Sequence, residues 1–234
     1  MTVNTWRPHA QNPSLVPHGC IRCAGLGGYL AVYCDDDGGD TLRILIALEC
    51  SGLTRDAFLA LGHDAWSCDK KPTERPGPHY ECDIREVLYQ PWDMMIAHPV
   101  CKYLANSGNR WLYEKPGRME LLEQAAEFFK LFDKAEHIPL RAVENPIMRH
   151  AIERVGRKAD QYVHPHFFGS PFQKATGLWL HGLPKLVRTH WPKDYQVKIQ
   201  QAVWKMPPGP NRETDRSRTD PAIAQAFANQ WGNL

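Results

Sequence analysis

Hydrophobic and polar residues follow no regular period through residue 42, and they become regular from residue 43 onward. Short apolar runs of the length of buried strands then alternate with segments of helical period. The runs predict strands at 43–49, 63–69, the start of 79–88, 92–97 and 138–144. Because strands alternate with helices, we expect parallel βαβ units and a sheet covered on both faces.

The helical segments between these runs differ in strength. A short helix is expected at 54–62, with Thr54 as candidate N-cap and Gly62 as the stop, and another within 79–88 after its strand. The strongest pattern, at 117–137, places four apolar side chains on one stripe: Met119, Leu122, Ala126 and Phe129.

Composition narrows the class of protein. A chain of 234 residues fits one domain with a sizeable core, or one domain with a small appendage. No apolar run approaches the length of a membrane span, and the first residues lack the apolar centre of a signal peptide. The seven cysteines are odd in number and irregularly spaced, which favours a reducing compartment. We therefore expect a cytoplasmic protein with no membrane partner.

The segment 1–42 is expected to be an N-terminal extension. It contains His18, Cys20, Cys23 and Cys34, and a CxxC pair with a third thiol and an imidazole can complete a tetrahedral zinc site. A zinc finger or ribbon usually offers two paired half-sites, and the second pair is missing. The alternative is a loosely folded extension that adds an edge strand.

Polar residues follow the first three predicted strands at their carboxyl ends. Glu49, Cys50, Ser51 and Gly52 form a small-residue turn into a helix, where backbone approaches a ligand closely. Asp69 ends the second strand, where an acidic residue accepts hydrogen bonds from ribose hydroxyls, and Asp83 follows the third. The order and spacing predict a nucleoside-shaped ligand. Singly, such residues are also common as turns and helix caps.

Two further residues are placed at the same edge of the predicted sheet. The run 92–97 breaks at Pro99 and delivers Cys101 into a loop, and Glu144 ends the fifth strand just before Pro146. Ligands of open α/β sheets bind outside the carboxyl ends of the strands, so the thiol and the carboxylate face a substrate. The alternatives are a small buried cysteine and a structural carboxylate.

Six segments occur in the order of the motifs of DNA cytosine-5 methyltransferases: LECSGLTRDAF, SCD, CD, AHPVC, AVENP and FFGSPFQKATGLWL. The chain resembles this family over about residues 43 to 182. The resemblance implies a doubly wound, mostly parallel, Rossmann-like methyltransferase sheet and S-adenosylmethionine as cofactor. It assigns the cofactor to Glu49, Ser51, Gly52, Asp69, Asp83 and Pro99.

The same resemblance implies the roles of the catalytic residues. Cys101 looks like the nucleophile that adds to carbon 6 of cytosine, and Glu144 like the acid that protonates ring nitrogen 3. Gln173 and Lys174 match the segment that braces the base, although Lys174 stands near an expected arginine and lacks its planar fork. Arg216 and Arg218 could replace the arginines that the family has in this segment. His98 and Val100, beside Pro99, depart from the family's Pro-Pro-Cys.

The last third of the chain is basic, which suits a polyanionic partner. Residues 151–218 hold 12 Lys and Arg against 5 Asp and Glu, a net +7 that leaves −5 for the rest of a +2 chain. The resemblance divides the chain into a catalytic domain at 43–182, a much reduced recognition region at 183–218 and a closing helix at 219–234. We expect DNA with the target cytosine flipped out. Sequence specificity is then low, or comes from a partner subunit.

Three alternatives stay open beside methylation of cytosine carbon 5 in DNA. The substrate is instead RNA or a free pyrimidine nucleotide, or the chain is a degenerate nucleic-acid-binding protein without catalysis. A third alternative, an exocyclic-amine methyltransferase, needs an amide or carboxylate before the prolines and an aromatic after them, and His98 and Cys101 supply neither. A looser resemblance to small phage-encoded methyltransferase-like proteins places the chain in the host cytoplasm if it is phage-encoded.

Overall fold

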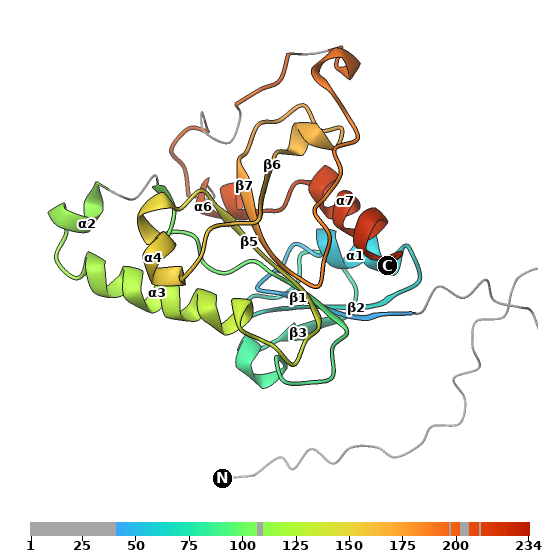
Figure 1. Cartoon of the computed structure of the whole chain (residues 1–234), viewed down its shortest axis with the longest axis horizontal. Coiled ribbons are helices and arrows are strands. Elements are labelled where there is room, and N and C mark those ends of the chain that lie inside the picture. Colours follow the sequence, from blue (N-terminus) through green and yellow to red (C-terminus); the bar gives the residue numbers. More distant parts are fainter. Residues whose placement is uncertain (1–40, 107–109, 197, 202–205, 211) are drawn as a thin grey trace, which may run out of the picture. The chain divides into compact units, whose positions relative to one another are not determined.

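The computed structural model describes residues 41–106, 110–196, 198–201, 206–210 and 212–234. Within this part, seven strands form one sheet in the order β3-β2-β1-β4-β5-β7-β6. The strands are β1 (Arg43–Ala47), β2 (Asp64–Asp69), β3 (His79–Glu81), β4 (Met94–Ala97), β5 (Leu140–Pro146), β6 (Gln161–Val163) and β7 (Thr176–His181). Strands β1 to β5 pair in parallel, and β7 is antiparallel to both of its neighbours. The predicted mostly parallel, Rossmann-like α/β sheet is confirmed (Figure 1).

Helices cover both faces of the sheet (Figure 1). They are α1 (Leu53–Leu59), α2 (Trp111–Glu114), α3 (Arg118–Asp133), α4 (Ile152–Val155), α6 (Arg212–Ser217) and α7 (Pro221–Trp231). Because side chains of a strand alternate between faces, Leu45 and Ala47 of β1 pack in the core with α3, whereas Ile44 and Ile46 pack with α1 and α7. The face of α3 toward the sheet buries Leu122, Ala126 and Phe129, as its apolar stripe predicts, together with Phe132.

The start of α1 differs from the prediction. Thr54 lies inside the helix and is fully buried, and the N-cap is Gly52, in the left-handed region at φ 74°. The Leu53 N–H donates instead to Glu49 Oε1 at 3.2 Å and to Ser51 Oγ at 3.3 Å. Side chains of the preceding turn therefore cap the helix, so Thr54 is not needed for that purpose.

The helix expected within 79–88 is also shorter than predicted. It is a single 3-10 turn, η1 (Ile84–Glu86), and Asp83 and Glu86 close it through a capping box. Among the described residues, three further 3-10 turns are η3 (Arg149–Ala151), η4 (Pro165–Phe167) and η5 (Pro192–Asp194).

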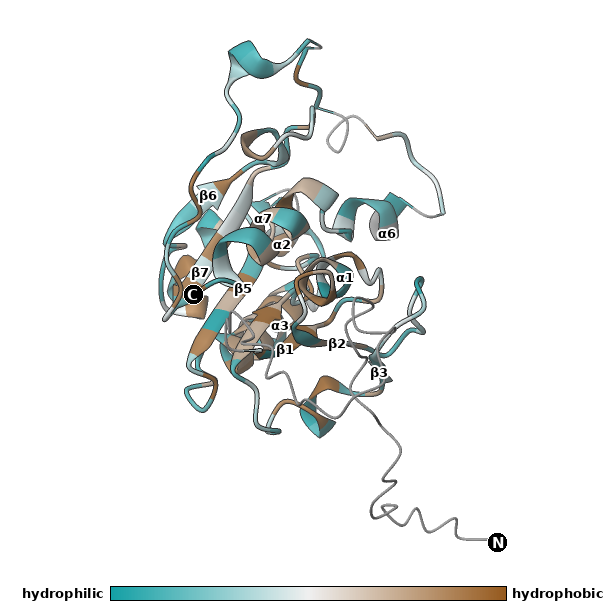
Figure 2. Cartoon of the chain, turned by 90° about the vertical axis from the view of Figure 1, so that its right-hand side faces the viewer, coloured by the Kyte–Doolittle hydropathy of each residue, from teal (hydrophilic) through white to brown (hydrophobic). Residues whose placement is uncertain are grey.

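The C-terminal part returns to the body of the sheet. Helix α7 packs against α1 and buries Phe227 and Trp231, whose rings stack with centroids 4.7 Å apart. Leu183 and Leu186 are buried in the same core. Helix α6, with the sequence RETDRS, is hydrophilic along its length (Figure 2). Among the described residues, none of the helices has the length and apolar content that crossing a membrane requires.

The topology determines where a ligand is expected to bind. From β1 the sheet grows through β2 to β3 on one side and through β4 to β5 on the other, so the strand order reverses between β1 and β4. In open α/β sheets the ligand crevice lies outside the carboxyl ends of the strands at this switch point. Leu48, directly after β1, has a φ of 61°, which is uncommon for a residue other than glycine.

Candidate active site

Two adjoining hollows lie at the carboxyl edge of the sheet. The smaller one, of about 120 Å³, is lined by the turn after β1, and we call it the β1 hollow. The larger one, of about 1540 Å³, is lined by the loop after β4 and the end of β5, and we call it the cleft. Five residues line both, which shows that the hollows are continuous: Leu48, Asp69, Lys71, His98 and Ser217.

The turn after β1 is held by Glu49. This carboxylate is 6% exposed, and its Oε1 accepts from the Ser51 hydroxyl as well as from the Leu53 N–H. Its Oε2 is buried and has no hydrogen-bond partner within the described chain. A buried acceptor without a partner costs free energy, so this oxygen is suited to accept from a ligand in the β1 hollow. Gly52 belongs to the same turn, and a Cβ there would lie 2.6 Å from Arg55 Nη2.

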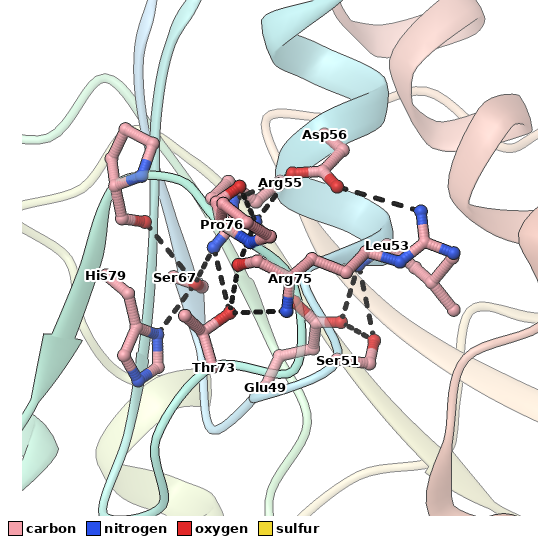
Figure 3. A network of polar contacts seen from close by, with 11 residues as sticks. Glu49, Ser51, Leu53, Arg55, Asp56, Ser67, Thr73, Arg75, Pro76 and His79 are labelled. Atoms are coloured by element: carbon pink, nitrogen blue, oxygen red, sulfur yellow. Dashed lines mark hydrogen bonds and ion pairs between the residues drawn. The ribbon is translucent and has the colours of Figure 1, made fainter.

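Arg55, on α1, is a buried residue that the sequence analysis missed. Its guanidinium is fully buried and donates hydrogen bonds of 2.7–3.2 Å to five residues (Figure 3). They are the side chains of Asp56, Ser67 and Thr73 and the carbonyls of Arg75 and Pro76. Arg55 thereby ties the loop 70–78 to α1 and β2, and this loop supplies Lys71 and Glu74 to the β1 hollow.

The two aspartates after β2 and β3 have different surroundings. Asp69 is half-buried, accepts from the Lys71 N–H at 2.9 Å and lines both hollows. Asp83 lines the cleft but caps η1 and pairs with Lys70 at 2.9 Å and Arg85 at 3.2 Å. The hydrogen bond from Lys70 and the one from the Arg85 N–H lower the pKa of Asp83. Asp69 has the surroundings expected of a ligand-binding residue, whereas Asp83 is engaged as a helix cap.

Cys101 and Glu144 both line the cleft. They come together because β4 and β5 are parallel neighbours, with Ala97 opposite Val143. Cys101 is half-buried, and burial together with the negative charge of Glu144 raises the pKa of its thiol, against smaller lowering effects of cations that include Lys174. The thiol is therefore protonated at neutral pH and has to lose its proton before it can act as a nucleophile.

Glu144 is paired with a residue that the sequence analysis treated only as a departure from the family motif. His98 Nδ1 lies 3.2 Å from Glu144 Oε2, and the two side chains are 8% and 13% exposed. Burial raises the pKa of Glu144, but the hydrogen bond from His98, the charge of Lys174 and a hydrogen bond from Thr176 outweigh it, and the net pKa lies below the ordinary value. The carboxylate is thus ionised at neutral pH.

The residues expected to brace a base or contact phosphate occupy separate places. Lys174 Nζ donates to the Arg218 carbonyl at 3.0 Å, and the Gln173 N–H donates to the Gln200 carbonyl at 2.8 Å. Arg216 lines the cleft, whereas Arg218 lines the β1 hollow. Arg218 pairs there with Glu74 at 2.8 Å and with Asp215 at 2.9 Å. The structure thus separates two arginines that the sequence placed together.

Two other expectations concern Pro99 as a cofactor-binding residue and a zinc site near the N-terminus. The Pro99 carbonyl accepts from Asn145 Nδ2 at 2.8 Å, and Pro99 lines the cleft. Cys20, Cys23, Cys34 and His18, the residues expected to bind zinc, lie outside the described residues. Among the residues that the structure describes, no group of three or more His, Cys, Asp or Glu could hold a metal ion.

Comparison with known proteins identified similar structures but no similar sequences. No protein-family model and no curated protein matches the chain. A putative DNA modification methyltransferase encoded within an E. coli prophage has 13% identity and a TM-score of 0.43, and the match covers 71% of this chain and 56% of that one. A mutant of DNMT2 from Spodoptera frugiperda has 15% identity and a TM-score of 0.35, with 68% and 57% covered. The Entamoeba histolytica methyltransferase EhMeth has 11% identity and a TM-score of 0.39, with 64% and 57% covered.

The chain therefore spans 56–57% of the length of these proteins. All three are described as methyltransferases, and at this level of identity the likeness concerns the fold alone.

Proposed function

We propose that this protein is an S-adenosylmethionine-dependent methyltransferase that modifies carbon 5 of cytosine in DNA through a covalent adduct with Cys101. One observation carries the proposal. A thiol from the loop after β4 and a carboxylate from the neighbouring parallel strand β5 line the same cleft, and this cleft adjoins the β1 hollow. The segments AHPVC and AVENP supply Cys101 and Glu144, and they are the most specific part of the resemblance to cytosine-5 methyltransferases.

Three residues in or beside the β1 hollow support the assignment of the cofactor to it. Glu49 Oε2 is a buried acceptor without a partner in the described chain, suited to the amino group of an amino-acid tail. Asp69 lies where an acidic residue accepts from ribose hydroxyls, and the turn at Gly52 allows close approach of the backbone. S-adenosylmethionine supplies an electrophilic methyl group on a sulfonium when it is bound.

Asp69 provides a direct test of this part of the proposal. Asp69→Ala should weaken cofactor binding by roughly 1–3 kcal/mol, because hydrogen bonds to a charged acceptor are lost. Isothermal titration calorimetry measures the effect. Unchanged affinity in the variant, or no binding of S-adenosylmethionine to the wild-type protein, would contradict the cofactor assignment.

Cys101 and Glu144 are proposed to act on different atoms of the cytosine ring. The Cys101 thiol loses its proton and adds to carbon 6, which makes carbon 5 enamine-like and able to accept the methyl group. Glu144 must carry a proton to neutralise ring nitrogen 3 during this addition. Its carboxylate is ionised and the Cys101 thiol is protonated, so the proton that leaves Cys101 can pass through Glu144 to ring nitrogen 3. Lys174 and Arg216 reduce the cost of the thiolate, since both lower the pKa of Cys101.

The walls of the cleft suit a polyanion with exposed bases. Lys115 and Arg118 lie on the wall formed by α2, α3 and the turn between them, and Arg212 and Arg216 lie on that of α6. Trp111 also lines the cleft, with Arg110 Cζ 4.1 Å and Lys115 Nζ 4.5 Å from its ring centroid. Cations beside an aromatic ring favour phosphates and stacked bases without reading sequence. We therefore propose DNA with a flipped-out cytosine as substrate, with low sequence specificity unless a partner subunit supplies it.

Covalent trapping tests the proposed function. An oligonucleotide with 5-fluorocytosine should form a denaturation-resistant adduct in the presence of S-adenosylmethionine, because fluorine does not leave carbon 5 as the proton does. Cys101→Ser should abolish the adduct, and Glu144→Gln should slow its formation by on the order of 10²–10⁴. Trapping of a fluorinated free nucleotide or of RNA, but not of DNA, would replace DNA as the substrate. No adduct with any of them, with nucleic acid still bound, would favour a binding protein without catalysis.

A further inference from the structure

His98 lies where the two hollows meet. It is the first residue after β4, and its backbone N–H donates to the Ala47 carbonyl at 3.0 Å, which fixes the main chain beside β1. The side chain lines both the β1 hollow and the cleft, although it is only 8% exposed. A group at this junction lies between the proposed cofactor site and the thiol of Cys101.

The two ring nitrogens of His98 have different surroundings. Nδ1 lies 3.2 Å from Glu144 Oε2, and an ionised carboxylate only accepts, so Nδ1 carries the hydrogen. In the neutral ring the hydrogen on Nδ1 leaves Nε2 as the bare acceptor. Nε2 is buried and has no hydrogen-bond partner within the described chain. A carboxylate that holds one nitrogen of an imidazole, with the other nitrogen left without a partner, is the arrangement of a general base.

The proposed function leaves one proton without an acceptor, and this inference rests on that proposed function. After the methyl group has been added, carbon 5 still carries its hydrogen, and the adduct must lose it before the product is released. We propose that His98 Nε2 takes the carbon-5 proton while Glu144 holds the ring through Nδ1. The electron pair of the C5–H bond forms the C5=C6 double bond, the C6–S bond breaks, Cys101 leaves as a thiolate, and ring nitrogen 3 returns to Glu144 the proton that it received. The imidazolium then returns its proton to solvent.

Charged groups surround His98 on both sides. In the β1 hollow they are Glu49, Asp69, Lys71, Glu74 and Arg218, with the thiol of Cys50 beside them. On the cleft side they are Cys101, Glu144, Lys174 and Arg216.

The competing role for His98 makes the opposite prediction. If His98 served to deliver a proton to Glu144 for ring nitrogen 3, it would act before methyl transfer. Loss of His98 would then slow the formation of the adduct as much as it slows turnover. Separating these two rates therefore decides between the roles.

The test uses His98→Asn in the full chain. The Asn amide keeps an N–H donor for Glu144 but has no titrating nitrogen in place of Nε2. Three quantities are compared with the wild type under single-turnover and multiple-turnover conditions. They are the rate of 5-fluorocytosine adduct formation, the turnover on ordinary cytosine, and the amount of denaturation-resistant adduct on ordinary cytosine.

We expect trapping within about threefold of the wild-type rate, turnover lower by on the order of 10²–10⁴, and accumulation of the adduct on ordinary cytosine. His98→Gln provides a second variant if His98→Asn does not fold, and partial rescue of turnover by added imidazole supports the assignment.

Two results would overturn the assignment of His98 as the base. Turnover of His98→Asn within about threefold of wild type shows that the proton leaves by another route, and trapping that falls in parallel with turnover shows that His98 acts earlier. In both cases the wild-type protein still forms its adduct, so the proposed function stands. A wild-type protein without any adduct overturns the proposed function, and the assignment of His98 with it.

Discussion

Replacing Arg55 by leucine should destabilise the protein by about 3 kcal/mol. The guanidinium is fully buried, and the substitution leaves its partners without donors: Asp56, Ser67, Thr73 and the carbonyls of Arg75 and Pro76. Removing one partner of a buried ion pair costs roughly 3–5 kcal/mol. The Asp56 side chain is 33% exposed and keeps Arg75 at 3.7 Å, so we expect the lower end of that range.

Urea denaturation followed by circular dichroism measures this difference, with Arg154→Leu as the matched control. Arg154 forms a surface pair with Glu123, whose side chain is 52% exposed, and such pairs contribute about 0–1 kcal/mol. Arg55→Leu should also weaken binding of S-adenosylmethionine, because the loop 70–78 loses its anchor beside the β1 hollow. A free energy of unfolding no lower than that of the control would refute the reasoning.

Two further predictions concern the cleft. At pH 8, iodoacetamide should alkylate Cys101 faster in Glu144→Gln and more slowly in Lys174→Met, since the carboxylate raises the pKa of the thiol and the ammonium lowers it. Mass spectrometry of the labelled peptide measures both rates, and equal rates in all three proteins would contradict the electrostatic account. Arg216→Glu should weaken binding to an oligonucleotide more than Arg218→Glu does, because Arg218 is already paired with two carboxylates. Fluorescence anisotropy at two salt concentrations provides the comparison, and equal losses would show that both arginines contact phosphate.

Much of the fold follows from local sequence pattern. The apolar runs that predicted β1, β2, β4 and β5 are buried strands because parallel strands inside a covered sheet have both faces in the core. The prediction of Thr54 as the N-cap of α1 is wrong, because the cap comes from Glu49 and Ser51 in the preceding turn rather than from a residue at the helix boundary. The antiparallel strand β7 was not predicted as a strand, since the sequence 176–181 was read only as part of a motif.

The sequence likewise predicts some residues of the site and misses others. Cys101 follows one predicted strand and Glu144 ends the next, so parallel pairing of these strands places both residues on one cleft, and the sequence is sufficient for that. Three of the five partners of Arg55 lie 18–21 residues away in an irregular loop, and the side-chain partner of His98, Glu144, lies 46 residues away. Side-chain pairing over such separations depends on tertiary packing, which no periodicity records. It is also why Arg216 and Arg218, two residues apart, face different hollows.

The position of the transferred methyl group tests the central claim most directly. Nucleosides from DNA and RNA of cells that express the wild-type protein or Cys101→Ala can be separated and identified by mass spectrometry. The account predicts 5-methyl-2′-deoxycytidine with the wild-type protein and none above background with Cys101→Ala. Methylation of an exocyclic amine, or 5-methyl-2′-deoxycytidine that persists without the Cys101 thiol, would contradict it.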